Sequence, residues 1–123
     1  MTDVMVDKTI VIEDVGSISE LRCPRCAGQY LHQLSVVVFD RAEDASHVIR
    51  TTVEGGTSRT DVVPNAGSGN PSARRDGLSI LFWCEGCDAK RADPIELTIA
   101  QHKGCTEIGW RYRPAAKFIV SGS

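Results

Sequence analysis

Four of the five cysteines form two Cys-x-x-Cys pairs, and these are the residues that most clearly indicate chemistry. Cys23 is paired with Cys26, and Cys84 with Cys87. Two intervening residues allow a tight turn in which both thiolates point at one ion. Two such turns complete a tetrahedral shell of four sulfurs, and disulfides are not expected in a reducing cytosol. We therefore expect one structural Zn²⁺ per chain, in a closed site with no position left for a substrate.

The distance between the two pairs departs from that of compact zinc sites. The 57 residues between Cys26 and Cys84 exceed the roughly 15–20 of the compact spacing. An insertion must therefore loop out between the two turns. Two unrelated cysteine pairs, each buried or redox-active, remain the alternative interpretation of this spacing.

The remaining thiol and the histidines carry weaker signals. Cys105 could act as a nucleophile beside His102, but the sequence shows neither an orienting group nor an oxyanion site. We therefore expect a small residue at a hairpin end, and no enzyme. His32 and His102 could replace a cysteine as zinc ligands, but four thiolates already fill the shell. His47 is expected at the surface.

Several arginines and lysines are candidate binding residues. Arg74 and Arg75 follow a flexible segment and could clamp a phosphate or a partner's carboxylate. Alternatively they form a solvated loop end, or one of them is held by Asp76. Four further bases flank the cysteine pairs and would form one patch for nucleic acid if the pairs meet: Arg22, Arg25, Lys90 and Arg91.

The overall charge favours a protein partner over nucleic acid. The chain of 123 residues has a net charge of −2 and a pI of about 5.9, whereas a nucleic-acid-binding domain is typically basic, with a pI above about 9. The first twenty residues hold one basic and five acidic side chains. Trp83 and Trp110 could stack on bases, but their alternation with aliphatic residues predicts core positions.

The residue pattern predicts strands and no amphipathic helix. Residues 29–39, 46–54 and 77–83 are β-branched and aromatic, as is typical of strands. Residues 1–20 suggest an acidic arm or one or two short strands. Residues 55–77 are rich in Gly, Ser, Asn and Pro, which predicts a long loop with at most a short strand inside.

The C-terminal part predicts a β-hairpin in a defined register. Residues 103–104 are Lys-Gly, and the glycine supplies the positive φ that a two-residue turn needs. Leu97 then faces Trp110 on an apolar side, and Glu96 faces Arg111 on a polar side. Since both strands alternate with a period of two in the same register, the pairing is well specified.

Together these elements predict a mainly β protein: an antiparallel zinc ribbon with a β insertion between the two knuckles and a C-terminal β-hairpin. We expect an acidic arm or strand at 1–20, a zinc-ribbon domain at 21–114 with the insertion at 40–77, and a tail at 115–123. An exposed ribbon edge could pair two copies into a homodimer. No apolar run approaches the roughly 20 residues of a membrane span, and the N-terminus lacks a secretory signal, so we expect a cytoplasmic location.

Two segments resemble known sequences. Cys23-Pro24-Arg25-Cys26 resembles the Cys-Pro-x-Cys-Gly knuckle of zinc-ribbon proteins, with Ala27 at the usual glycine position and Gly28 after it. Residues 70–77, 82–87 and 99–104 are similar to small zinc-ribbon proteins of bacteriophages and mobile elements. That resemblance implies a cytoplasmic, metal-holding accessory or regulatory protein that binds a host or phage protein.

Overall fold

The computed structural model describes residues 12–15, 18–87 and 94–112, and these residues form strands and loops only. Within these ranges no helix is long and apolar enough to span a bilayer. The expectation of a mainly β protein is confirmed. The strands are β1 (Ile12–Val15), β2 (Ile18–Leu21), β3 (Leu31–Asp40), β4 (His47–Glu54), β5 (Thr57–Pro64), β6 (Gly77–Cys84), β7 (Ile95–His102) and β8 (Cys105–Tyr112).

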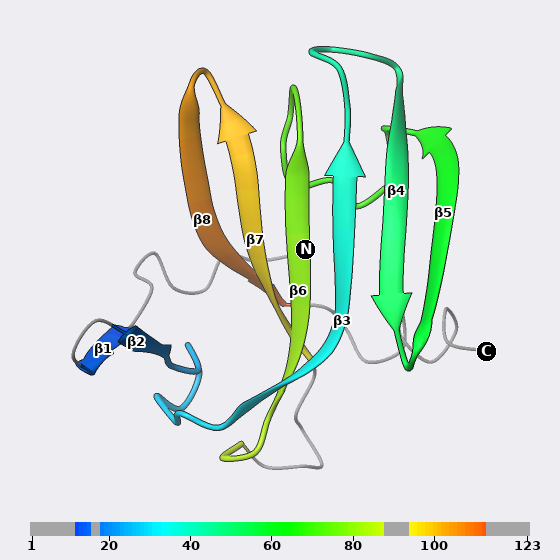
Figure 1. Cartoon of the computed structure of the whole chain (residues 1–123). Helices are drawn as coiled ribbons and strands as arrows, with labels where there is room; N and C mark the ends of the chain where they lie inside the picture. Colours follow the sequence, from blue (N-terminus) through cyan, green and yellow to red (C-terminus); the bar gives the residue numbers. More distant parts are fainter. Residues whose placement is uncertain (1–11, 16–17, 88–93, 113–123) are drawn as a thin grey trace.

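Six of the strands form one antiparallel sheet in the order β5-β4-β3-β6-β7-β8, and β1 pairs with β2 as a separate ribbon (Figure 1). The central pair of the sheet joins segments that are far apart in the sequence. Leu31, at the start of β3, lies opposite Cys84, at the end of β6. This register places the first and second cysteine pairs at the same end of the sheet.

The sheet has two unlike faces, because successive side chains of a strand point to opposite sides. We call them the loop face and the knuckle face. The loop face carries Phe39, Arg50, Ser79 and Glu96; the knuckle face carries Val38, Ile49, Ile80 and Trp110.

The main core lies on the knuckle face, over β6, β7 and β8. Ile95 and Trp110 are fully buried, and the ring of Phe82 meets that of Trp110 edge to face at 6.3 Å between centroids. The buried cluster consists of Cys23, Cys84, Ile95, Leu97 and Trp110. One cysteine of each pair, Cys23 and Cys84, is therefore part of the apolar core of this half of the sheet.

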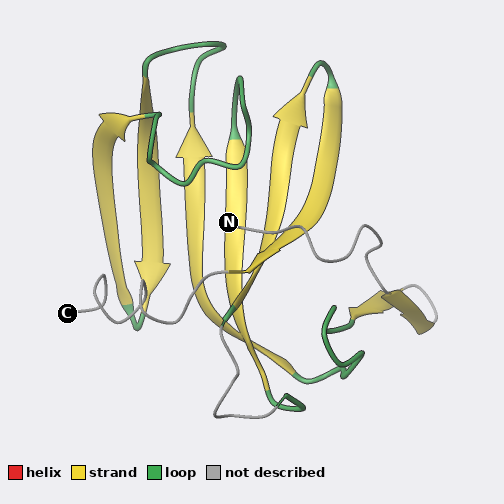
Figure 2. Ribbon diagram, turned by 180° about the vertical axis from the view of Figure 1, so that it is seen from behind, coloured by secondary structure: helices red, strands yellow, loops and turns green. Residues whose placement is uncertain are grey.

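A loop at residues 65–76 crosses the loop face on the other side (Figure 2). Its centre is Ser72, which is buried and donates its hydroxyl to the Gln101 carbonyl at 2.6 Å. The Asn70 side chain accepts the Ser72 amide and donates to the Arg75 carbonyl. A Cβ on Gly77 would fall 2.3 Å from Asn70 Oδ1, so this close approach requires glycine.

The C-terminal hairpin has the predicted register. Leu97 faces Trp110, and Glu96 faces Arg111. The turn residues Lys103 and Gly104 have φ values of 52° and 82°, which suits the turn that matches the twist of paired strands.

One expectation for the insertion was wrong. Residues 57–64 are an eight-residue strand, β5, which pairs with β4 along its whole length, where a long loop was expected. Gly55 and Gly56 both have positive φ and close the hairpin between the two strands. The Gly-Gly turn was the available signal, but the Gly, Ser, Asn and Pro content of residues 55–77 suggested a long loop with a short strand inside.

Candidate metal centre

The four cysteines of the two pairs come together at one end of the sheet. Their sulfurs all lie within 4.8 Å of one another, with Cys23 Sγ 3.7 Å from Cys87 Sγ and Cys26 Sγ 3.5 Å from Cys84 Sγ. All four are free thiols; Cys23 and Cys84 are buried, while Cys26 is exposed. The described residues therefore contain one cluster that could hold a metal ion, made of the four predicted ligands.

The first knuckle is a tight turn whose backbone points hydrogen-bond donors at the sulfurs. The Arg25 amide donates to Cys23 Sγ at 3.3 Å, and the Gly28 amide donates to Cys26 Sγ at 3.4 Å. The Ala27 amide closes the turn on the Cys23 carbonyl at 2.8 Å. Ala27 has a φ of 64°, a left-handed conformation that glycine adopts more easily. The alanine therefore keeps the knuckle geometry at some cost in backbone strain.

The second knuckle begins where β6 ends. The Glu85 amide donates to the Tyr30 carbonyl at 3.0 Å, which continues the β3–β6 ladder into the turn. A Cβ on Gly86 would lie 3.4 Å from Cys26 Sγ and 4.0 Å from Cys84 Sγ. The backbone of the second pair thus passes close against the first, and the sheet register fixes the relative position of the two turns.

The thiols interact strongly with one another and with the backbone. Burial and the neighbouring thiols raise the pKa of Cys87 to about 12, and burial is also the main cause of the raised pKa of Cys84. For Cys23 burial acts in the same direction, but hydrogen bonds from the amides of Arg25 and Cys26 and from the thiols of Cys84 and Cys87 together outweigh it and lower the pKa. Four thiolates this close require a cation, so protons compete with metal binding and affinity should fall at low pH.

The aromatic residues next to the cluster are arranged differently from the prediction for one tryptophan. Trp110 is core, as predicted. Trp83 is not: its side chain is on the loop face, is 38% exposed and packs on His32 at 5.0 Å between ring centroids. His32 Nε2 lies 2.9 Å from Glu85 Oε1, and this ring is outside the sulfur cluster. Alternation along β6 places Trp83 on the face opposite to Phe82 and Cys84, where the knuckles do not cover it.

The predicted basic patch around the knuckles is only partly within the described residues. Arg22 donates to the Ala27 carbonyl at 3.0 Å, which supports the first knuckle. Arg25 is half-buried, with its guanidinium 5.3 Å from the centre of the Tyr112 ring. Lys90 and Arg91 lie outside the described residues. The two described arginines thus contact the knuckle and the core.

The other two predicted binding residues lie at the opposite end of the sheet, just before β6. Arg74 donates to Glu43 at 2.9 Å and to Asp44 at 3.1 Å, while Arg75 is exposed. Asp76 binds neither of them through its carboxylate, which accepts the Arg41 amide at 2.9 Å.

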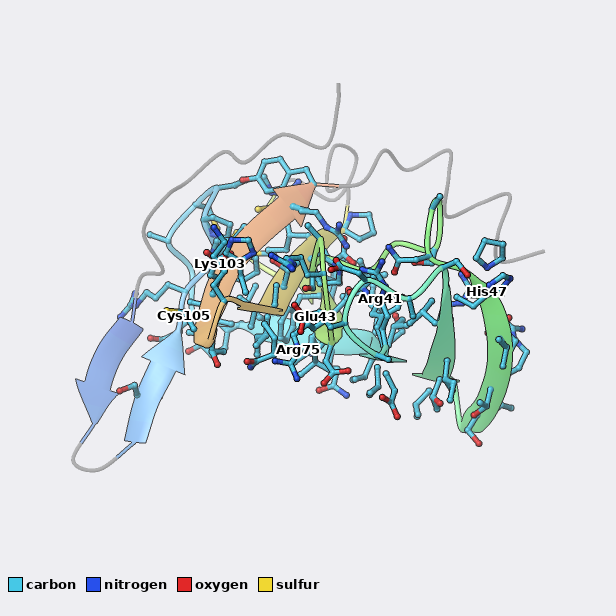
Figure 3. All side chains as sticks on the ribbon, turned by 90° about the horizontal axis from the view of Figure 1, so that it is seen from above. Arg41, Glu43, His47, Arg75, Lys103 and Cys105 are labelled. Carbon is cyan, nitrogen blue, oxygen red and sulfur yellow. The ribbon has the colours of Figure 1, made fainter. Side chains whose placement is uncertain are left out.

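The exposed thiol lies at this far end too. Cys105 is exposed and faces His102 across the hairpin turn. Figure 3 looks onto this end and labels Arg75, Lys103 and Cys105. His47 begins β4 and is exposed, as predicted. The far end therefore collects Arg74, Arg75 and Cys105, while the four-cysteine cluster lies at the other end.

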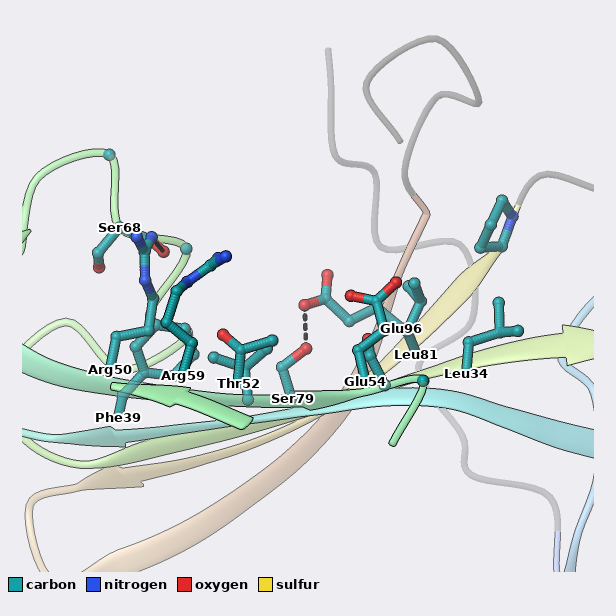
Figure 4. Close-up of a pocket in the computed structure, with 16 residues that line it drawn as sticks. Leu34, Phe39, Arg50, Thr52, Glu54, Arg59, Ser68, Ser79, Leu81 and Glu96 are labelled. Atoms are coloured by element: carbon teal, nitrogen blue, oxygen red, sulfur yellow. Dashed lines mark hydrogen bonds between the residues drawn. The ribbon is translucent and has the colours of Figure 1, made fainter. Parts of the chain in front are cut away.

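A hollow on the loop face, with a volume of about 720 Å³, contains polar residues that the sequence did not mark as a group (Figure 4). The buried Glu96 carboxylate accepts a hydrogen bond from the Ser79 hydroxyl. It also accepts two hydrogen bonds from the Arg111 guanidinium, at 3.0 and 3.1 Å. Arg50 is paired with Asp61 at 3.0 Å. The cross-strand Glu96–Arg111 pair was readable from the register, but the part played by Ser79 depends on strand order, which local pattern does not reveal.

The described residues define an all-β protein with a four-cysteine cluster that could hold a metal ion. Comparison with protein-family models, with curated proteins and with solved structures finds no match. The geometry of the cluster and its surroundings is therefore the ground for a functional proposal.

Proposed function

We propose that Cys23, Cys26, Cys84 and Cys87 hold one structural Zn²⁺ and that the chain is a non-enzymatic zinc-ribbon binding module. The spacing of the sulfurs carries this proposal. A tetrahedron with Zn–S arms of about 2.3 Å has edges of about 3.8 Å. The Cys23–Cys87 and Cys26–Cys84 separations of 3.7 and 3.5 Å match these edges, and the four sulfurs all lie within 4.8 Å of one another. Both separations are too long for disulfides.

A zinc ion in this cluster would act as a cross-link. It would tie the turn before β3 to the end of β6, two segments that 57 residues separate in the sequence. Because four protein sulfurs complete the coordination shell, the metal has no open position for substrate or water. The ion therefore serves the fold, and binding is assigned to the surface around it.

The partner we propose is a host or phage protein, with the chain acting as an accessory or regulatory protein in the cytoplasm. The acidic N-terminal segment and the pI near 5.9 support a protein partner. Nucleic acid is the second candidate, because the exposed rings of His32 and Trp83 lie on the knuckle end of the sheet and such rings can stack on bases.

Metal content in a matched pair of cysteine variants tests the zinc site. The full chain should carry one zinc by native mass spectrometry and melt cooperatively. Cys84→Ser should lose the metal and the cooperative transition together, since metal binding is coupled to folding. Cys105→Ser is the control and should keep both the metal and the cooperative transition, because Cys105 lies at the end of the sheet opposite to the four-cysteine cluster. A Cys84→Ser protein that retains a full zinc equivalent would exclude the four-thiolate site.

Binding of the zinc-loaded chain to single-stranded DNA and RNA separates the two partner classes. The protein-partner proposal expects no salt-sensitive change in fluorescence anisotropy. Salt-sensitive binding that is lost in a variant with Arg22, Arg25, Lys90 and Arg91 all changed to Glu would support nucleic acid instead. The zinc content of that variant must equal the wild type, since Arg22 and Arg25 also contact the first knuckle.

A further inference from the structure

The knuckle face is uncovered over β3, β4 and β5. Val38 and Ile49 are each 44% exposed, Val53 49% and Val62 66%. At the opposite edge of the sheet, and on the same knuckle face, Ile108 of β8 is 51% exposed. Monomeric proteins seldom expose contiguous apolar patches of this kind unless the patch meets a partner.

This uncovered surface holds no charged side chain between its ends. The charged residues of β4 and β5 that lie between the strand ends, Arg50, Arg59 and Asp61, point to the loop face. On the knuckle face, Thr51 and Thr60 face each other and their hydroxyls are 2.9 Å apart. Because these hydroxyls bond to one another, the surface can be covered by apolar groups with little loss of hydrogen bonding.

The exposed and partly exposed side chains of this face also form continuous rows across the strands. One row runs through all six strands of the sheet on the knuckle face: Thr60, Thr51, Val38, Leu78, Ile99 and Ile108. β-Branched and aliphatic rows of this type form the inner faces of β-sandwiches, where two sheets pack about 10 Å apart. The knuckle face of the sheet therefore resembles one inner face of a β-sandwich.

We propose that the uncovered knuckle face is a dimer interface, on which a second copy of this chain stacks its own knuckle face about a two-fold axis. A two-fold axis places a surface against itself, so a central charge would face its like. The central part of this surface has none, and charged partners such as nucleic acid find no complement on it. The proposal does not depend on the identity of the metal.

The size of the surface sets the strength of the association. About five residues of 3.4 Å on each of β3, β4 and β5, and about three on each of β6, β7 and β8 beyond the buried core, cover roughly 400 Å² in projection at a strand spacing of about 4.8 Å. Two copies would then bury about 800 Å², which is below the roughly 1,200–2,000 Å² of stable interfaces and typical of weak ones. We therefore expect a dimer that dissociates on dilution.

Two neighbouring residues of β4 provide a matched test. Val53→Lys places a charge on the knuckle face of β4, whereas Glu54→Lys places the same side chain on the loop face. In sedimentation equilibrium of the zinc-loaded full chain, the wild type and Glu54→Lys should share one monomer–dimer equilibrium. Val53→Lys should raise the dissociation constant about tenfold or more. Ile108→Lys and Glu107→Lys form a second matched pair on β8 with the same expectation.

Zinc content and far-UV circular dichroism equal to the wild type establish that each variant folds. A wild type that stays monomeric at the highest concentrations it tolerates overturns the proposal. A dimer that Val53→Lys and Ile108→Lys leave unchanged also overturns it. That second result would indicate pairing through the backbone of an edge strand, β5 or β8, because side chains on the face of the sheet do not take part in that ladder.

Discussion

The two halves of the sheet bury their apolar side chains on opposite faces. In the half formed by β6, β7 and β8, Ile95 and Trp110 are buried on the knuckle face. In the half formed by β3, β4 and β5, Phe39 and Val48 are buried on the loop face. One sheet is thus covered from one side by the cysteine knuckles and from the other by the 65–76 loop. Each half therefore leaves a different surface for binding.

The means of stabilisation differ in the same way. The knuckle half combines an apolar cluster with the four cysteines. The other half relies on polar contacts: Arg50 pairs with Asp61 and also donates to the Ser68 carbonyl at 3.2 Å. Arg111 of β8 donates to the Gly69 carbonyl at 2.8 Å. The loop is therefore held from both halves, by one arginine from each.

The largest expected effect concerns the apolar core. Trp110→Ala should lower the free energy of unfolding by about 3–5 kcal/mol, because a fully buried ring is replaced by a cavity. Val62→Ala in the other half should change it by less than about 0.5 kcal/mol, since this side chain is mostly exposed. Urea unfolding of the zinc-loaded protein below its dimerisation range measures both. Similar losses in the two variants would contradict the comparison of the halves.

An intermediate effect is expected at Glu96, where β7 meets the loop face. Its carboxylate accepts hydrogen bonds from Ser79 and from two nitrogens of Arg111. Glu96→Gln should lower the free energy of unfolding at neutral pH by about 2 kcal/mol, as charge-assisted hydrogen bonds are lost in a buried place. The same urea titration measures it. No loss would mean that Arg111 holds the loop without its counter-ion.

Asp61→Asn removes the carboxylate that pairs with Arg50 in the other half of the sheet. It is the control for the Glu96–Arg111 pair. Hydrogen bonds from Arg50 lower the pKa of Asp61 below its ordinary value. A lowered folded-state pKa gives stability that is present above the unfolded-state pKa and is lost as the pH falls through the folded value. At neutral pH, Asp61→Asn should lower the free energy of unfolding by less than Glu96→Gln does. In acid, the difference between Asp61→Asn and the wild type should vanish.

The sequence revealed the parts of the molecule that depend on short-range pattern. The register of the C-terminal hairpin followed from the turn at 103–104 and the alternation on both strands, and the four-cysteine cluster followed from the two Cys-x-x-Cys pairs. The full length of strand β5 was missed because the Gly, Ser, Asn and Pro content of residues 55–77 resembled that of a long loop. The exposure of Trp83 depends on which parts of the loop face are covered, which is a tertiary property that alternation does not contain.

The smallest expected effect compares one turn from each half. Ala27, in the first knuckle, and Gly55, between β4 and β5, have nearly the same left-handed backbone, with φ values of 64° and 59°. An alanine in this conformation costs about 1–2 kcal/mol, while a glycine adds roughly 0.4–1 kcal/mol of unfolded-state entropy. Ala27→Gly should therefore stabilise the protein by up to about 1 kcal/mol, and Gly55→Ala should destabilise it by a similar amount.

No atom lies within 4 Å of the Cβ that Gly55→Ala would add, so that variant measures backbone strain alone. Equal and opposite changes in thermal unfolding of the zinc-loaded variants would show that Ala27 contributes strain and nothing else. If Ala27→Gly brings no gain while Gly55→Ala brings the full loss, the Ala27 methyl offsets its strain. In that case the knuckle half depends on tight packing even in its turns, and the hairpin half does not.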